Sequence, residues 1–117
     1  MQLFLVGINH NTASVDIREK IAFSEEELIP ALKSLKDSLA LEEIAILSTC
    51  NRTEIYAISE VSESENIKHQ LANLKKIEYN KIRDSFYVKS SNEAANHALK
   101  VASGLDSLIL GESQVLG

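Results

Sequence analysis

Cysteine, histidine and glycine are scarce in this chain of 117 residues, and each shortage excludes a kind of site. A single cysteine, Cys50, rules out an intramolecular disulfide framework and fits a reducing compartment. No cysteine cluster offers a zinc site, and the three histidines lie far apart, so no metal is expected. The four glycines form no G-x-G-x-x-G array of the kind that binds a dinucleotide.

Long hydrophobic runs and an excess of positive charge are also missing. No apolar stretch approaches the ~18–20 residues that span a bilayer. The N-terminus MQLFLVGINH lacks the basic start and cleavage site of a signal peptide. We therefore expect a cytoplasmic protein with no membrane partner. The formal net charge of −5 argues against binding nucleic acid mainly by electrostatics, but not against handling one end of an RNA.

Hydrophobic residues make up 44% of the chain, which is enough for the core of one domain. Residues 105–117, LDSLILGESQVLG, stay apolar and patterned to the last glycine. Natural C-termini more often trail off in polar residues, so we expect this chain to be part of a longer protein.

Apolar patterning predicts the element order β-α-α-β-β-α-β-α. Strands are expected at residues 3–9, 43–47, 53–58 and 86–88. The first is a nearly continuous apolar run, typical of a central strand that is covered on both faces. This order favours an α+β fold of the ferredoxin-like, split β-α-β type: a mainly antiparallel sheet with helices on one face.

Capping residues predict where the helices begin. Ser14 or Thr12 caps a short helix that ends near Ala22, and capping boxes open helices at residues 24–27 and 62–65. Leucines 28, 32, 35 and 39 fall on one helical face and are expected in the core. The last helix is expected to start at Ser91 or Asn92 and to end near Ser103, with Gly104 as its C′ residue.

The one thiol lies in STCNRTE (48–54), a polar stretch between two expected strands. A thiolate is the reactive form of cysteine, and Arg52 is placed to stabilise it or to bind a substrate carboxylate. Alternatively, Cys50 ends a strand and tucks inward while its neighbours satisfy the turn. Local chemistry alone leaves both readings open.

The stretch STCNRTE (48–54), followed by Tyr56, resembles the active-site signature of glutamyl-tRNA reductase. GINHNTASVDIREKIAF (7–23) resembles the N-terminal segment of that family. His97 lies in a matching alanine-rich stretch, EAANHALKVASGLDS (93–107), and GESQVLG (111–117) completes the resemblance. The matches extend from residue 7 to the last residue, with freer sequence between them.

The resemblance implies NADPH-dependent reduction of glutamyl-tRNA to glutamate-1-semialdehyde, the first step of five-carbon tetrapyrrole (haem) synthesis. It implies that Cys50 attacks the aminoacyl ester, releases tRNA and forms a thioester that hydride then reduces. It further implies a homodimer and an association with glutamate-1-semialdehyde aminomutase. Residues 1–117 correspond to the N-terminal catalytic, glutamate-recognition domain, so the NADPH-binding and dimerisation domains are expected outside this chain.

The resemblance also assigns site residues. Catalysis is implied for Cys50 and for His97, the latter as a general base or an orienting group. Substrate binding is implied for Thr49, Cys50, Asn51, Arg52, Ser107, Glu112, Ser113 and Gln114. The residues by themselves allow plainer readings: His97 as a packed helix residue, and Ser107 as a helix N-cap after Gly104.

Two other classes of function stay open. A cofactor-independent thiol hydrolase or acyltransferase predicts turnover by this chain alone. A non-catalytic α+β binding module predicts a buried, inert thiol. A basic cluster, formed by Lys75, Lys76, Lys81 and Arg83, is either solvated surface or an RNA contact.

Overall fold

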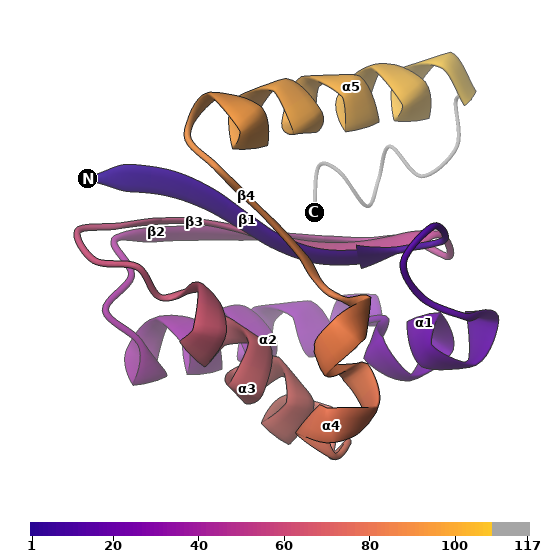
Figure 1. The fold of residues 1–117 in the computed structure, drawn as a ribbon, viewed down its shortest axis with the longest axis horizontal. Coiled ribbons are helices and arrows are strands. Elements are labelled where there is room, and N and C mark those ends of the chain that lie inside the picture. The colour runs from indigo at the N-terminus through magenta and orange to yellow at the C-terminus, as the bar shows by residue number, and fades with distance from the viewer. Residues whose placement is uncertain (109–117) are drawn as a thin grey trace.

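A four-stranded antiparallel sheet lies between two layers of helices in the computed structural model, which describes the backbone of residues 1–108 and the side chains of residues 1–103 (Figure 1). The strands run in the order β2-β3-β1-β4, and every neighbouring pair is antiparallel. They are β1 (Gln2–Asn9), β2 (Glu43–Ser48), β3 (Arg52–Ser59) and β4 (Tyr87–Ser90). The predicted α+β fold with an antiparallel sheet is confirmed.

Helices cover both faces of the sheet, but unequally. One face carries α1 (Val15–Ile21), α2 (Glu25–Ser38), α3 (Ser64–Leu74) and α4 (Tyr79–Ile82), the last followed by the 3₁₀ turn η1 (Arg83–Ser85). Of the elements within residues 1–108, the other face carries only α5 (Asn92–Leu108) (Figure 1). The prediction of helices on one face therefore holds for the split β-α-β unit and misses α5. A second layer is required because β1 is buried on both sides, with Leu5 and Val6 at most 1% exposed.

The helix starts were predicted with mixed success. Ser14, not Thr12, caps α1, because its hydroxyl accepts a hydrogen bond from the backbone N–H of Ile17. The predicted capping box of α2 is present. The predicted box at residues 62–65 is wrong, since α3 begins after Glu63 without a side-chain cap. The short α4 and η1 carry too weak a pattern to be predicted.

The end of α5 was also predicted wrongly, because the helix continues to Leu108. Gly104 therefore lies inside the helix instead of ending it. One glycine costs a helix only ~1 kcal/mol relative to alanine, and the alanine-rich sequence before it favours continuation.

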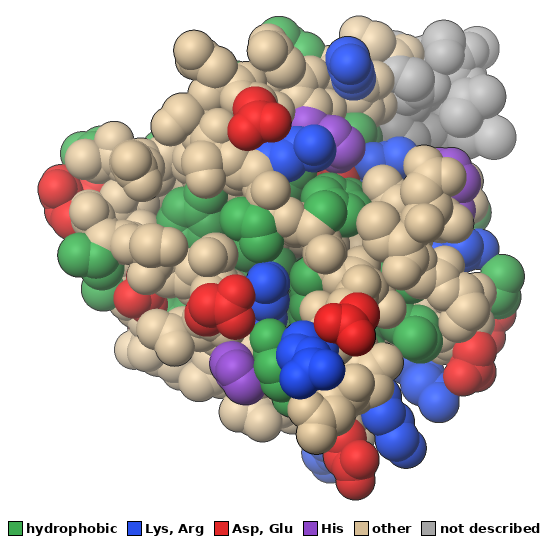
Figure 2. Space-filling view, viewed as in Figure 1, with side chains coloured by type: hydrophobic (Ala, Val, Ile, Leu, Met, Phe, Trp, Pro, Cys, Tyr) green, Lys and Arg blue, Asp and Glu red, His purple; other side chains and the backbone are tan. Residues whose placement is uncertain are grey.

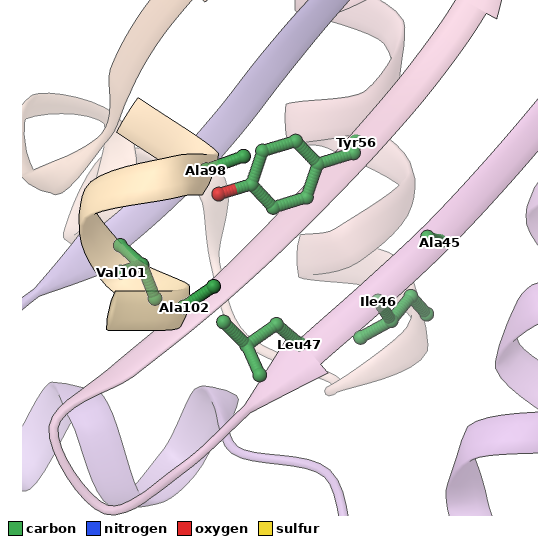
Figure 3. Close-up of a pocket in the computed structure, with 7 residues that line it drawn as sticks. All are labelled: Ala45, Ile46, Leu47, Tyr56, Ala98, Val101 and Ala102. Carbon is green, nitrogen blue, oxygen red and sulfur yellow. The ribbon is translucent and has the colours of Figure 1, made fainter. Parts of the chain in front are cut away.

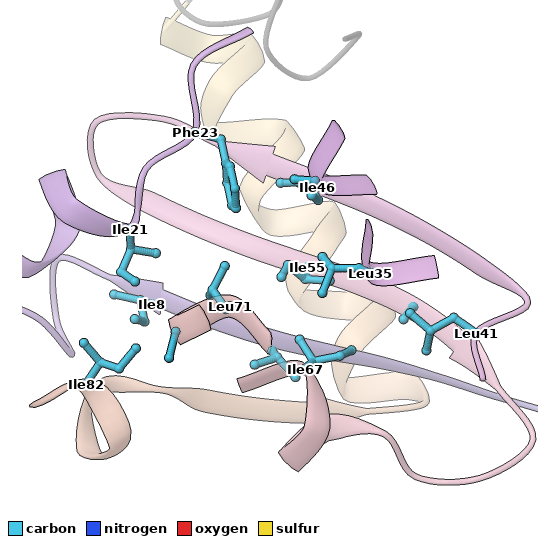
Figure 4. Packing of buried hydrophobic residues seen from close by; sticks show 14 of the residues in the cluster. Ile8, Ile21, Phe23, Leu35, Leu41, Ile46, Ile55, Ile67, Leu71 and Ile82 are labelled. Carbon is cyan, nitrogen blue, oxygen red and sulfur yellow. The ribbon is translucent and has the colours of Figure 1, made fainter. Parts of the chain in front are cut away.

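The hydrophobic core lies between the sheet and the helices α1 to α4 (Figure 4). Ile8 from β1 and Ile55 from β3 belong to the same buried cluster as Leu71 of α3. The predicted leucine stripe of α2 belongs to the core, with Leu35 fully buried and the other three leucines packed against the cluster. This layer covers one face of the sheet, and α5 lies on the opposite face.

Candidate active site

The single thiol lies at the tip of the β2–β3 hairpin. The backbone N–H of Thr49 donates to the carbonyl of Arg52 at 2.8 Å, which closes the turn around Cys50 and Asn51. The hydroxyl of Thr49 accepts from the backbone N–H groups of Asn51 (3.2 Å) and Arg52 (3.3 Å). Cys50 itself is exposed. The alternative in which Cys50 tucks inward, and the buried thiol expected of a binding module, are therefore both wrong.

A row of residues across the sheet forms the floor of the site under α5. Gly7 of β1 lies opposite Glu54 of β3 on one side and opposite Tyr87 of β4 on the other. A Cβ atom on Gly7 would lie 2.8 Å from the ring and hydroxyl of Tyr87. Because Gly7 has no side chain, the ring of Tyr87 can cross β1 and reach Glu54.

Glu54 accepts hydrogen bonds from four side chains, although its own side chain is 0% exposed. Arg52 Nη1 lies 3.1 Å and His97 Nε2 2.6 Å from its Oε2 atom. The hydroxyl of Tyr56 donates to Oε1 at 2.7 Å, and that of Tyr87 donates to Oε2. We call these five residues the Glu54 cluster; they come from β3, β4 and α5.

The cluster keeps Glu54 negatively charged. Burial raises the pKa of Glu54, but hydrogen bonds from Tyr87, Tyr56 and His97, together with the charge of His97, outweigh burial and lower it below its ordinary value. Burial and the bond to Glu54 raise the pKa of both Tyr56 and Tyr87, so both phenols stay protonated donors. The arrangement is a buried carboxylate held between two tyrosines and two basic groups.

A cavity of about 240 Å³ adjoins the cluster between α5 and the strands β2 and β3 (Figure 3). It is lined by Ala45, Ile46, Leu47, Tyr56, Ala98, Val101 and Ala102. Tyr56 belongs to both the cavity and the cluster, and the other lining residues are apolar. The cavity therefore offers an apolar surface beside a set of charged groups.

The structure brings several predicted site residues together. Thr49, Cys50 and Asn51 share the hairpin tip with Arg52, and Arg52 Nη1 lies 3.4 Å from His97 Nε2, across 45 residues of sequence. The backbone of Ser107 lies within α5, so the reading of Ser107 as an N-cap is wrong. Its side chain, with the predicted residues Glu112, Ser113 and Gln114, lies outside the described residues.

Four members of the site were not predicted: Gly7, Glu54, Tyr56 and Tyr87. Glu54 carried a usable signal, because Arg52, Glu54 and Tyr56 alternate along one strand and so point to one face. A charged residue in the middle of an apolar strand is also unusual. Tyr87 carried no local signal, since its role depends on the pairing of β4 with β1.

The predicted basic cluster is partly used within the fold. The ammonium group of Lys75 pairs with Glu27 at 3.2 Å and lies 4.5 Å from the ring centre of Phe23. Lys76 and Lys81 line a separate hollow of about 480 Å³. Acidic and basic side chains are interspersed over the face seen in Figure 2. We therefore assign none of these lysines to an RNA contact.

Two searches of the described residues had negative results. Within residues 1–108, no three histidine, cysteine or acidic side chains gather to hold a metal ion. In the same part of the chain, no helix is long and apolar enough to cross a membrane.

Comparison with known proteins identifies relatives. A family profile described as "Glutamyl-tRNAGlu reductase, N-terminal domain" matches residues 6–117. The glutamyl-tRNA reductases of Saccharophagus degradans and Teredinibacter turnerae are each 50% identical over all 117 residues, which cover 27% and 28% of those proteins. The solved structure of glutamyl-tRNA reductase from Methanopyrus kandleri matches with a TM-score of 0.63 and 35% identity, over 97% of this chain and 25% of that one. The chain thus spans about a quarter of the length of these relatives.

Proposed function

This chain belongs to the glutamyl-tRNA reductase N-terminal domain family, and from that premise we propose that it is the catalytic domain of a cytoplasmic glutamyl-tRNA reductase. The enzyme reduces glutamyl-tRNA to glutamate-1-semialdehyde at the start of tetrapyrrole synthesis. The observation that carries the proposal is the exposed Cys50 at the hairpin tip, beside Arg52 and within a chain that matches the family throughout.

The part of the reaction that belongs to this chain is acyl transfer. The thiolate of Cys50 attacks the carbonyl carbon of the aminoacyl ester, and a C–S bond forms while the ester C–O bond breaks. The terminal hydroxyl of tRNA leaves with a proton, and the glutamyl group stays on sulfur. A thioester carbonyl accepts hydride more readily than an ester, because sulfur donates less electron density by resonance.

The residues around Cys50 have separate roles in this proposal. Arg52 binds a carboxylate of the substrate: Nη1 is engaged by Glu54, but a guanidinium has five N–H donors in all. His97 transfers protons, and the apolar cavity beside Tyr56 holds the methylene groups of the glutamyl chain. Thr49 and Asn51 complete the hairpin contacts. Ser107, Glu112, Ser113 and Gln114 are assigned to the same pocket from the family resemblance.

The described residues do not fit a nicotinamide cofactor. Dinucleotide sites of the Rossmann type need a parallel β-α turn rich in glycine, whereas this sheet is antiparallel throughout residues 1–108. No residue within 1–108 is therefore assigned to hydride transfer. NADPH binding and dimerisation belong to parts of the enzyme outside this chain, and the aminomutase that consumes the aldehyde is a proposed partner.

The decisive test is a chimera in which this chain replaces the matching segment of the Saccharophagus degradans enzyme. The chimera should make glutamate-1-semialdehyde from glutamyl-tRNA and NADPH, and Cys50→Ser should abolish this, because a serine hydroxyl is far less ionised than a thiol. Ala40→Ser, which adds a serine at an exposed position, is the control and should change nothing. Reduction at a near wild-type rate by the Cys50→Ser chimera would refute the thioester route.

The isolated chain separates the reductase from the thiol hydrolase alternative. Given glutamyl-tRNA and NADPH, it should make no aldehyde, because nothing in the part of the chain that the structure describes orients the cofactor, and oriented binding is worth roughly 7–11 kcal/mol of barrier. Free glutamate and glutamate-1-semialdehyde are separated and their amounts are measured. Fast, repeated release of glutamate by the isolated chain without NADPH would instead favour the hydrolase.

A further inference from the structure

We infer that Glu54 is a positioning residue that keeps the proton of His97 on Nε2, so that Nδ1 is the ring nitrogen left for proton transfer. Glu54 also fixes Arg52 beside His97. The use of Nδ1 in catalysis depends on the proposed function. The place of the ring proton is a property of the folded chain and can be tested without any activity.

The place of the proton follows from what each partner can donate or accept. An ionised carboxylate only accepts hydrogen bonds, and His97 Nε2 lies 2.6 Å from Glu54 Oε2. Nε2 must therefore carry the hydrogen of this bond, whether the ring is neutral or charged. The shared proton cannot come from Glu54, whose pKa is held below its ordinary value by the tyrosine and histidine bonds.

Arg52 is a competing donor, because a guanidinium only donates and Nη1, with two hydrogens, lies 3.4 Å from Nε2. The distances favour the carboxylate as the acceptor for both groups, since Nη1 lies closer to Glu54 Oε2, at 3.1 Å, and Nε2 lies closer still to that oxygen, at 2.6 Å. The Oε2 atom of Glu54 thus accepts hydrogen bonds from both Arg52 and His97, and it fixes their relative position before the substrate binds.

The groups that donate hydrogen bonds to Glu54 come from three elements. Arg52 and Tyr56 approach from β3, Tyr87 from β4 and His97 from α5. The two tyrosines replace the water that a carboxylate would have at the surface, so the charge survives full burial. Among the described residues no partner is found for Nδ1 of His97, which agrees with a nitrogen reserved for substrate.

Nitrogen-15 NMR of histidine tests the proton directly in the 117-residue chain. His97→Gln identifies the signals of His97 among the three histidines. The neutral ring should carry its proton on Nε2, the nitrogen that lies 2.6 Å from Glu54 Oε2. A ring that keeps the proton on Nδ1 and loses it from Nε2 would overturn the inference in the unmodified chain, without reliance on any variant.

Two variants test whether the position of the His97 proton depends on Glu54. Glu54→Gln removes the charge at nearly constant shape and should give a mixture of the two protonated forms. Glu43→Gln, at an exposed position on the neighbouring strand β2, is the matched control and should leave the spectrum of His97 unchanged. An unchanged Nε2–H form in Glu54→Gln would overturn the role of Glu54. If Glu54→Gln does not fold, Glu54→Asp, whose shorter side chain draws the carboxylate away from Nε2, should shift the ring in the same direction.

Kinetics of the chimera test the use of Nδ1. His97→Gln keeps an amide donor near the position of Nε2 but cannot titrate, so kcat for acyl transfer should fall about 10²–10⁴-fold with little change in KM. Glu54→Gln also releases Arg52, so it should raise KM as well as lower kcat. Near wild-type kcat in His97→Gln would show that only the Nε2 donor matters. An inactive unmodified chimera would refute the proposed function and leave the NMR result intact.

Discussion

The same strands form both faces of the sheet, but one face buries apolar side chains and the other face buries a charged cluster. Along β3, Ile55 points to the helices α1 to α4 and Glu54 points to α5, and both are 0% exposed. Burial of Ile55 is favourable in itself, since it removes apolar surface from water. Burial of Glu54 is costly and is tolerated only because four side chains bond to it. One strand thereby supplies stability on one side and chemistry on the other.

The comparison also shows how the active-site face tolerates its charged cluster. The core face contributes an apolar cluster that spans β1, β2 and β3 and the four helices α1 to α4. Among the described residues, that cluster contains no residue of α5, so its apolar contacts stabilise β1, β2 and β3 without the polar network. Substitutions on the core face should therefore reduce the free energy of unfolding, and substitutions around Glu54 should reduce activity more than stability.

The largest stability effect is expected for Ile55→Ala. It leaves a cavity in the core and should lower the free energy of unfolding by about 2–5 kcal/mol. Urea unfolding measures this. The control is Ile29→Ala, at a side chain of the same type that is 75% exposed on α2, and it should cost less than about 1 kcal/mol. Equal costs at the two positions would contradict the view of this face as the stabilising one.

On the opposite face of the sheet, a large effect on activity is expected for Arg52→Lys in the chimera. Lysine keeps the charge but loses the planar fork that joins Glu54 to a substrate carboxylate. We expect a loss of about 10²-fold in kcat/KM, equivalent to about 2.7 kcal/mol, with little change in stability. Arg83→Lys, at an exposed arginine, is the control. Steady-state kinetics with less than a threefold change would remove Arg52 from the site.

Gly7→Ala should disturb the active-site face without touching the core. The added Cβ would lie 2.8 Å from the ring of Tyr87, so the ring must move and its bond to Glu54 is strained. We expect a cost of about 1–3 kcal/mol in unfolding free energy. The cost should shrink when Gly7→Ala is made in a Tyr87→Ala background. A cost that is the same in both backgrounds would place the strain elsewhere.

The smallest effect is the pH dependence of stability that comes from Glu54. Its pKa in the folded chain is lowered from 4.5, chiefly because hydrogen bonds outweigh burial. Such a group stabilises the fold at pH above its unfolded pKa, and the contribution is lost as the pH falls through the folded pKa. Glu27 and Glu65, also lowered, titrate in the same window.

Urea unfolding of the wild type and Glu54→Gln, between neutral pH and about pH 3, isolates the share of Glu54. The wild type should lose more stability than the variant over this range. Parallel curves would mean that Glu54 is not held ionised by its neighbours.

The sequence by itself determined the local elements of this protein. Apolar runs and the 3.6-residue apolar period located all four strands and the longer helices, because these patterns depend only on neighbouring residues. The unbroken apolar run of β1 also indicated correctly that this strand is covered on both sides. The family signature pointed to Cys50, Arg52 and His97 from their place in the chain.

Only the tertiary structure decided what lies beside what on the α5 face. Tyr87 and His97 reach Glu54 across 33 and 43 residues of sequence. Those distances are closed by the pairing of β4 with β1 and by the crossing of α5 over the sheet. No local pattern encodes either event, since register and helix placement are set by burial summed over the whole fold. The sequence thus placed Glu54 on one face of a strand, and only the tertiary structure brought four donors to its carboxylate.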